Sequence, residues 1–261
     1  MEDTNLKDFE SLLNIMKRLR GPGGCPWDRE QTRDTLKWYL VEESYEVLDA
    51  IEEGSSDKLK EELGDTLFQI IFLARISEEE GRFNIFDVVN SIREKMIRRH
   101  PHVFQDESAR DSEEVKKIWW KIKEEEKGKR EEAIFDSIPE ALPSLLRAFR
   151  ITKRAAHAGF DWENPEGALC KLEEETEELK ESMNSGNKER MEDELGDVLF
   201  SLVNLGRFLD INPEEALRKT IAKFTTRFRV MERLAQEKDL KISDTPLEEM
   251  SKLWDEAKTK E

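Results

Sequence analysis

The sequence contains an internal repeat, and this repeat limits the possible folds more than any other feature. When the chain is shifted by 132 residues, the stretch 40–75 lies on 172–207 without a gap, and 13 of the 36 positions are identical. A unit that recurs at this spacing has the length of a small domain. We therefore predict a tandem duplication, with an N-terminal domain at 1–128, a linker at 129–138 and a C-terminal domain at 139–261.

Landmarks outside the identical block follow the same order in both halves. Cys25-Pro26-Trp27-Asp28 precedes the first block, and Gly159-Phe160-Asp161-Trp162 precedes the second. A basic segment follows each block, at 93–99 and at 223–229. The junction is expected in the charged run 124–130. The composition changes only mildly there, so a continuous helix that crosses between the units is an equal alternative.

Apolar residues recur at spacings of three and four along almost the whole chain, which is the periodicity of an amphipathic helix. Leu36, Leu40, Val47, Leu48 and Ile51 form one such stripe. No convincing alternation of apolar and polar residues, the pattern of a strand, is present, and Gly and Pro lie between the helical segments. We therefore predict an all-α protein with more than roughly 65 % helix, well above the usual fraction for globular proteins.

The chain is strongly acidic, because 43 Lys and Arg residues oppose 60 Asp and Glu residues and leave a net charge of −17. Proteins that bind nucleic-acid strands neutralise phosphates with clustered basic residues, so this balance argues against such strands and against an anionic membrane. The longest apolar stretch, Leu67 to Ala74, is too short for a transmembrane helix. Two cysteines without a disulfide framework, and a start without a signal-peptide pattern, favour the cytoplasm.

Acidic residues at a fixed spacing are the part of the repeat that carries chemistry. Glu43 and Glu46 are three residues apart, as are Glu62 and Asp65, so each pair occupies one face of its predicted helix. The short turn at 53–56 makes the two helices antiparallel neighbours, and four carboxylates then converge between them. The second copy keeps all four acids at the same spacing: Glu175, Glu178, Glu194 and Asp197.

Four carboxylates in one place repel each other unless protons or a cation neutralise them. Mg²⁺ suits such a site, since it prefers oxygen ligands and also binds water and phosphate oxygens. Neither motif contains His, which argues against a di-iron carboxylate site and against catalytic zinc. Glutamate-rich helices are common, so one pair alone is weak evidence. The repeat strengthens it, because the nearby acids Asp49, Glu52 and Glu61 are not identical in the second copy.

The motif at 42–65, Glu-Glu-x-x-Glu followed by Glu-x-x-Asp, occurs again at 174–197 and resembles that of the all-α nucleoside triphosphate pyrophosphohydrolases. The tandem arrangement is similar to that of the MazG family. Gly24-Cys25-Pro26-Trp27-Asp28 and the stretch 98–104 are also similar to the N-terminal half of that family. The resemblance spans nearly the whole chain.

The resemblance implies Mg²⁺-dependent hydrolysis of ribo- and deoxynucleoside triphosphates to the monophosphate and pyrophosphate, with Mn²⁺ able to replace the metal. It also implies a homodimer, active sites built on four-helix bundles and a housekeeping role in the nucleotide pool. In such relatives the C-terminal unit is the catalytic one. The implied metal ligands are Glu175, Glu178, Glu194 and Asp197, with Glu43, Glu46, Glu62 and Asp65 as their N-terminal counterparts.

Glu174 directly precedes the first of these ligands, and we predict that it orients or deprotonates the attacking water. Glu42 is its counterpart in the first unit. Glu174 and the metal ligand Glu175 are thus the predicted catalytic pair. Four further residues are expected to contact the nucleotide, because they align with such contacts in the family or lie among the ligands: Lys171, Arg190, Asp193 and Asp197.

Two signals in the second unit lie further along the chain. Lys223 and Arg227 share one helical face and correspond to a nucleotide-contacting segment in the family, although from the sequence alone they could equally form a solvated basic stripe. Trp254, like Trp27 and Trp162, either stacks on the base or packs in the core. We predict that Lys223 and Arg227 bind phosphates and that Trp254 contacts the nucleotide.

Two other functions stay open on the sequence. A helical regulatory or interaction module would hold a divalent ion only for stability. A phosphatase would release orthophosphate instead of pyrophosphate. The products formed from nucleoside triphosphates in the presence of Mg²⁺ distinguish these functions from the leading one.

Overall fold

The computed structural model describes residues 2–105, 108–127 and 133–259, and every secondary-structure element in these ranges is a helix. Helices account for 79 % of the structure. The predictions of an all-α protein and of a tandem duplication are therefore confirmed. None of the helices in the described part of the chain combines the length and the apolar composition that a bilayer-spanning helix needs.

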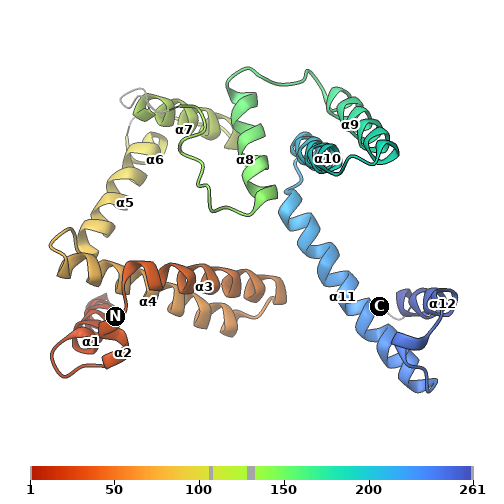
Figure 1. Cartoon of the computed structure of the whole chain (residues 1–261). Helices are drawn as coiled ribbons and strands as arrows, with labels where there is room; N and C mark the ends of the chain where they lie inside the picture. Colours follow the sequence, from red (N-terminus) through yellow and green to blue (C-terminus); the bar gives the residue numbers. More distant parts are fainter. Residues whose placement is uncertain (1, 106–107, 128–132, 260–261) are drawn as a thin grey trace. The chain divides into compact units, whose positions relative to one another are not determined.

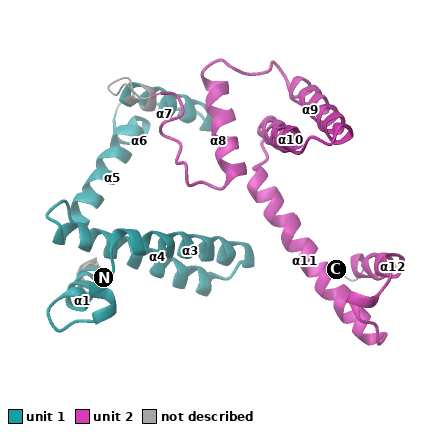
Figure 2. Cartoon of the chain, in the orientation of Figure 1, with its two compact units in different colours: residues 1–129 teal, residues 130–261 magenta. Residues whose placement is uncertain are grey.

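The structure divides into two compact units, residues 1–129 and 130–261, which Figure 2 shows in different colours. The predicted junction and linker fall partly on 128–132, which lie outside the described residues. On either side of this gap, α7 (Ser112–Lys127) ends at Lys127, and residues 134–137 form turns. The domain boundaries at 128 and 139 stay predictions.

The first unit is built around a helical hairpin and is completed by shorter helices on both sides of it (Figure 1). Its hairpin consists of α3 (Arg33–Glu53) and α4 (Ser56–Glu79). The other helices are α1 (Glu2–Arg20), α2 (Pro26–Glu30), α5 (Ile85–Arg99), α6 (Pro101–Phe104) and the α7 already given.

The second unit repeats the hairpin as α9 (Pro165–Ser185) and α10 (Lys188–Phe208). The helix α8 (Ser144–His157) packs against α10, as α1 packs against α4 in the first unit. After the hairpin, α11 (Pro213–Glu237) leads away from it and packs against α12 (Leu247–Lys258) at its far end (Figure 1). A short 3₁₀ helix, η1 (Ile242–Asp244), connects these last two helices.

The two hairpins begin their helices at matching positions because the capping residues are repeated as well. A polar side chain at the position before each helix accepts a hydrogen bond from a backbone N–H of the first turn, which would otherwise lack a partner. These N-caps lie 132 residues apart in the two units: Thr32 and Ser55 in the first, Asn164 and Asn187 in the second.

Each hairpin also ends its first helix in the same way. Gly54 and Gly186 adopt φ values of 69° and 70°, the left-handed conformation that glycine tolerates without steric cost. The turn that follows has the same length in both units, so the register between the two helices of each hairpin is the same. This shared register places the repeated acids opposite each other.

The buried cores of the two units lie in different places. In the first unit the core joins α1, α3 and α4 through Met16, Leu36, Ile71, Phe72 and Ile76. In the second unit the buried cluster lies between α11 and α12, and it consists of Met231, Leu234, Ala235, Leu253 and Ala257. The repeated hairpin is therefore supported differently in each half of the chain.

Candidate metal and nucleotide site

The hairpin of the second unit brings together acids from both of its helices. Glu175 projects from α9, while Glu194 and Asp197 project from α10, and one carboxylate oxygen of each lies within 4.8 Å of the others. Glu175 is buried, Glu194 is half-buried and Asp197 is exposed. The cluster is therefore anchored inside the hairpin and open to solvent on one side.

The first unit has an equivalent cluster. One carboxylate oxygen each of Glu43, Glu62 and Asp65 also lies within 4.8 Å of the others. Here Glu43 is half-buried, so the cluster is less enclosed than the one in the second unit. Glu43 has a hydrogen-bond partner in Gln69, whose Nε2 donates to Oε1 of Glu43 at 3.4 Å. Gln69 could not be found from the repeat, because Ser201 stands at the matching position of the second unit.

The fourth acid of each motif also interacts with its cluster. Burial, a hydrogen bond with Glu175 and the negative charges of Glu194 and Glu175 raise the pKa of Glu178. Burial and the charges of Glu175 and Glu194 likewise raise the pKa of Asp197. These carboxylates thus hold their protons more firmly than ordinary surface acids do.

The same crowding occurs in the first unit. Burial raises the pKa of Glu43, the hydrogen bond from Gln69 partly opposes this rise, and the charges of Asp65 and Glu46 add to it. Burial and the charges of Glu46, Glu61 and Asp65 raise the pKa of Glu62. Each cluster is therefore a concentration of like charge that a bound cation would relieve.

The residues present fit a hard divalent cation. Both clusters offer only carboxylate oxygens, which Mg²⁺ prefers, and include neither His nor Cys. The open side leaves room for water or for phosphate oxygens beside such an ion.

Lys171 distinguishes the second cluster from the first. Its Nζ lies 2.6 Å from Oε1 of Glu175 and 2.8 Å from Oε1 of Glu174. Hydrogen bonds to Glu174 and then to Glu175 raise the pKa of Lys171, so it is fully charged at neutral pH. The residue at this position in the first unit is Tyr39, which cannot supply a positive charge.

Arg190 supplies a second cation to the same cluster. Its Nε donates to Oε1 of Glu194 at 3.2 Å, and its guanidinium also lies 3.9 Å from Glu181. The matching residue of the first unit, Lys58, pairs instead with Glu53 at 2.9 Å. The two units thus share the acids but differ in the cations beside them.

The remaining predicted residues are not among the three acids of the cluster. Glu174 and Asp193 are exposed on the hairpin, next to the clustered acids in the sequence. Lys223 is exposed on α11, and the ring of Trp254 lies 5.0 Å from that of Phe224 at the α11–α12 end. The structure does not bring Lys223, Arg227 or Trp254 to the cluster within one chain, because α11 leads away from the hairpin (Figure 1). Their nucleotide contacts stay predictions.

Comparison with known proteins shows a match that covers both hairpins. The family model of the MazG nucleotide pyrophosphohydrolase domain matches residues 31–104 and again residues 163–230. The chain is 47 % identical over 250 residues to the nucleoside triphosphate pyrophosphohydrolase/pyrophosphatase MazG of Thermotoga maritima, covering 96 % of this chain and 95 % of that protein. It is 44 % identical over 260 residues to the nucleoside triphosphate pyrophosphohydrolase of Escherichia coli K12, covering 98 % and 99 %.

Proposed function

The chain belongs to the MazG family of nucleotide pyrophosphohydrolases, and from this premise we propose that it hydrolyses nucleoside triphosphates, including deoxynucleoside triphosphates, to the monophosphate and pyrophosphate with Mg²⁺. The observation that carries the proposal is the convergence of Glu175, Glu194 and Asp197 beside Lys171 and Arg190. Hydrolysis of a nucleoside triphosphate needs acidic side chains that bind a metal cation and basic side chains that bind the phosphate oxygens.

The metal ligands in this proposal are Glu175, Glu178, Glu194 and Asp197. When bound there, Mg²⁺ polarises the phosphates and neutralises charge on the leaving group, and Mn²⁺ has the same ligand preference. Lys171 and Arg190 bind phosphate oxygens once these replace the carboxylates that they now contact. The lysine and the arginine thereby contribute charge that would otherwise have to come from metal alone.

The hydrolytic step needs a water directed at the α-phosphorus. The water oxygen forms a bond to this phosphorus while the bond to the bridging α–β oxygen breaks, so pyrophosphate leaves. Glu174 is exposed beside the cluster and serves as the group that orients the water and accepts its proton. Nζ of Lys171 donates a hydrogen bond to Oε1 of Glu174 at 2.8 Å, which holds this side chain beside the cluster.

We assign catalysis to the second unit. Both units have three clustered acids, but only the second has Lys171 and Arg190 in contact with them. In the first unit Tyr39 and Gln69 are the neighbours of Glu43, and neither carries positive charge. The charge of Lys58 acts on Glu62, but the ion pair of Lys58 is with Glu53. The proposal thus places turnover at 139–261, the predicted C-terminal domain.

A homodimer completes the proposal. Leu195, Leu199 and Leu202 form an exposed apolar stripe on α10, and the identical Leu63 and Leu67 are exposed on α4. Exposed stripes of this kind mark surfaces that another chain covers, and packing two hairpins along them gives a four-helix bundle. A cytoplasmic role in clearing excess or non-canonical nucleotides is part of the same proposal.

The test is the identity of the products. Purified protein is incubated with a panel of ribo- and deoxynucleoside triphosphates and Mg²⁺, and the products are separated by anion exchange and identified by phosphorus NMR. Monophosphate and pyrophosphate support the proposal. Diphosphate and orthophosphate would show a phosphatase instead, and no turnover of any substrate would favour a regulatory module with a structural ion.

A further inference from the structure

The second unit contains a hollow that no residue of the acidic cluster lines. It has a volume of about 550 Å³ and lies between α8, the C-terminal half of α10, the loop 158–162 and the segment 134–135. Its walls are mainly apolar and aromatic, with Phe160, Trp162 and Phe200 among them, and Asn204 is one of the few polar groups. This size and composition are typical of sites that bind small molecules.

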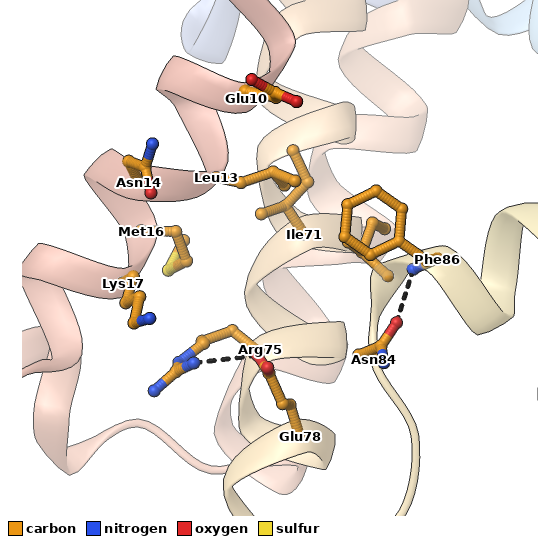
Figure 3. Close-up of a pocket in the computed structure, with 11 residues that line it drawn as sticks. Glu10, Leu13, Asn14, Met16, Lys17, Ile71, Arg75, Glu78, Asn84 and Phe86 are labelled. Atoms are coloured by element: carbon orange, nitrogen blue, oxygen red, sulfur yellow. Dashed lines mark hydrogen bonds and ion pairs between the residues drawn. The ribbon is translucent and has the colours of Figure 1, made fainter.

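The first unit is filled at the corresponding face. Phe72, which matches Asn204, is 1 % exposed there and lies edge-to-face with Phe68, with their ring centroids 6.1 Å apart. One hollow of the first unit opens elsewhere, between α1, α4 and α5, with Ile71 and Arg75 in its wall (Figure 3). The hairpin fold therefore does not require a hollow on this face, since its duplicate packs the face with an aromatic ring.

Two more positions of the first unit's core are smaller in the second unit. Leu36 and Ile71 belong to the buried cluster of the first unit, whereas Ala168 and Val203 stand at these positions in the second. Ala168 and Val203 are each 1 % exposed and do not line the hollow, so the difference between Phe72 and Asn204 is the one that lies at its wall. Unfilled volume there costs stability when nothing occupies it. An occupant that buries the exposed ring of Phe160 would recover part of that stability.

The hollow continues the face of α10 that carries the acids. Arg190, Glu194, Asp197, Phe200 and Asn204 follow each other at spacings of three and four, so they share one side of the helix. At about 1.5 Å per residue, Phe200 and Asn204 lie about 4.5 Å and about 10 Å along the axis from Asp197. From its N-terminal end, this face carries the basic side chain of Arg190, then two acidic side chains, then the ring of Phe200 and the amide of Asn204.

That order matches the order of groups in a nucleoside triphosphate that lies along α10. The terminal phosphates would lie towards Arg190, the metal-bound phosphates at Asp197, and the nucleoside beyond it. We propose that the hollow binds the nucleobase of the substrate, with Phe200 and Trp162 against its faces and the Asn204 side chain at its edge. This inference rests on the proposed function and adds the determinant of base recognition.

The hydrogen bonds around Asn204 define what its side chain offers. Oδ1 of Asn204 accepts a hydrogen bond from Nε of Arg207 at 3.0 Å, and Asp161 in turn holds the Arg207 guanidinium. The amide NH₂ group is thereby directed away from Arg207. It donates to an acceptor on the base, such as a carbonyl oxygen or a ring nitrogen. Recognition then combines stacking, which accepts any base, with one hydrogen bond that discriminates among them.

The experiment compares ligands with and without a base. Binding of α,β-methylene nucleoside triphosphates, which cannot be cleaved at the reacting bond, and of inorganic tripolyphosphate is measured by calorimetry with Mg²⁺. Asn204→Phe places the residue of the first unit in the hollow. We expect it to weaken the nucleotide analogues about tenfold or more and to change tripolyphosphate binding less than about twofold. Val203→Ile also copies the first unit, but Val203 does not line the hollow, so this control should bind both ligands as the wild type does.

Two further variants keep the test decisive if Asn204→Phe does not fold. Ala155→Leu fills the hollow from α8 and should also weaken only the base-containing ligands. Asn204→Asp removes the donor without changing size, and it should alter the ranking of the four bases. Wild-type affinity for the analogues in Asn204→Phe, or equal loss for both kinds of ligand, would overturn the inference. If the wild-type protein neither binds nor hydrolyses nucleotides, the proposed function itself fails, which is a distinguishable result.

Discussion

Lys171 occupies the side of the acidic cluster that a cation would use: its Nζ lies 2.6 Å from Oε1 of Glu175, whose side chain is only 8 % exposed. A buried carboxylate needs a counter-charge, and in this structure the lysine supplies it. The first unit has Tyr39 at the same position. The lysine and a metal ion therefore compete for the same carboxylate, and the triphosphate gains a basic partner when the metal displaces the lysine.

This competition predicts that Lys171→Gln binds Mg²⁺ more tightly when nucleotide is absent. Removing a positive charge near the metal should raise the affinity about tenfold. The same change should raise KM for the nucleotide, since a phosphate contact is lost. Calorimetric titration with Mg²⁺ alone measures the first effect. Lys180→Gln is the matched control, because Lys180 pairs with Glu177 on the exposed side of the same helix. Equal Mg²⁺ affinity in the two variants contradicts the competition.

The assignment of catalysis to the second unit predicts unequal effects of matched substitutions. Glu175→Ala should lower turnover at least about 100-fold, because the buried ligand at the centre of the cluster is lost. Glu43→Ala removes the equivalent ligand of the first unit and should leave turnover within about threefold. Steady-state release of pyrophosphate measures both. Comparable losses in the two variants would show that both units catalyse, or that the first supports the second.

The parts of the fold that depend on local sequence could be predicted from the repeat. The acids, the left-handed glycines Gly54 and Gly186 and the turn length recur at one spacing, so the hairpins and the convergence of their carboxylates follow from the sequence. The direction of α11 could not be predicted in this way, because α11 contacts α8, which lies outside the identical block. The hollow beside Asn204 also depends on the approach of α8, which lies outside the identical block.

The proposed role of Glu174 as general base predicts that its substitution lowers the rate of hydrolysis without weakening the binding of Mg²⁺. Glu174→Gln should lower kcat by about 100-fold or more, the usual contribution of a general base, while calorimetric Mg²⁺ affinity changes little. Glu42→Gln, the same change in the first unit, should leave kcat unaltered. Near wild-type turnover of Glu174→Gln at saturating Mg²⁺ contradicts this role and would direct the search for the base to another carboxylate.

The crowded acids predict an unusual dependence of stability on pH. Four carboxyl groups have raised pKa values in the folded state: Glu178, Asp197, Glu43 and Glu62. At a pH just above the ordinary pKa of these groups, the folded protein therefore binds more protons than the unfolded protein does. Stability without metal therefore rises as the pH falls from 7 towards about 5. Arg99 and Arg98 lower the pKa of Glu126 to about 2, so the stability that Glu126 contributes is lost only at more acidic pH.

Thermal melting at several pH values in EDTA measures this dependence. Saturating Mg²⁺ should raise the Tm most at neutral pH, where protons no longer relieve the repulsion, and less at pH 5, where protons compete with the metal. The double variant Glu178→Gln/Asp197→Asn should melt higher than the wild type in EDTA and respond less to Mg²⁺. A Tm in EDTA that falls between pH 7 and pH 5 would contradict the prediction.

The exposed leucines predict how the homodimer can be broken. In a symmetric dimer each substitution is felt twice, so Leu199→Glu on the α10 stripe removes the burial of two leucines. At about 1.5–3 kcal/mol for each leucine, the dimer dissociation constant should rise by roughly 100-fold or more. Sedimentation velocity over a concentration series measures it. Leu247→Glu is the control, since Leu247 is 75 % exposed at the start of α12, away from the stripe. Equal dissociation constants for wild type and Leu199→Glu would place the interface elsewhere on the chain.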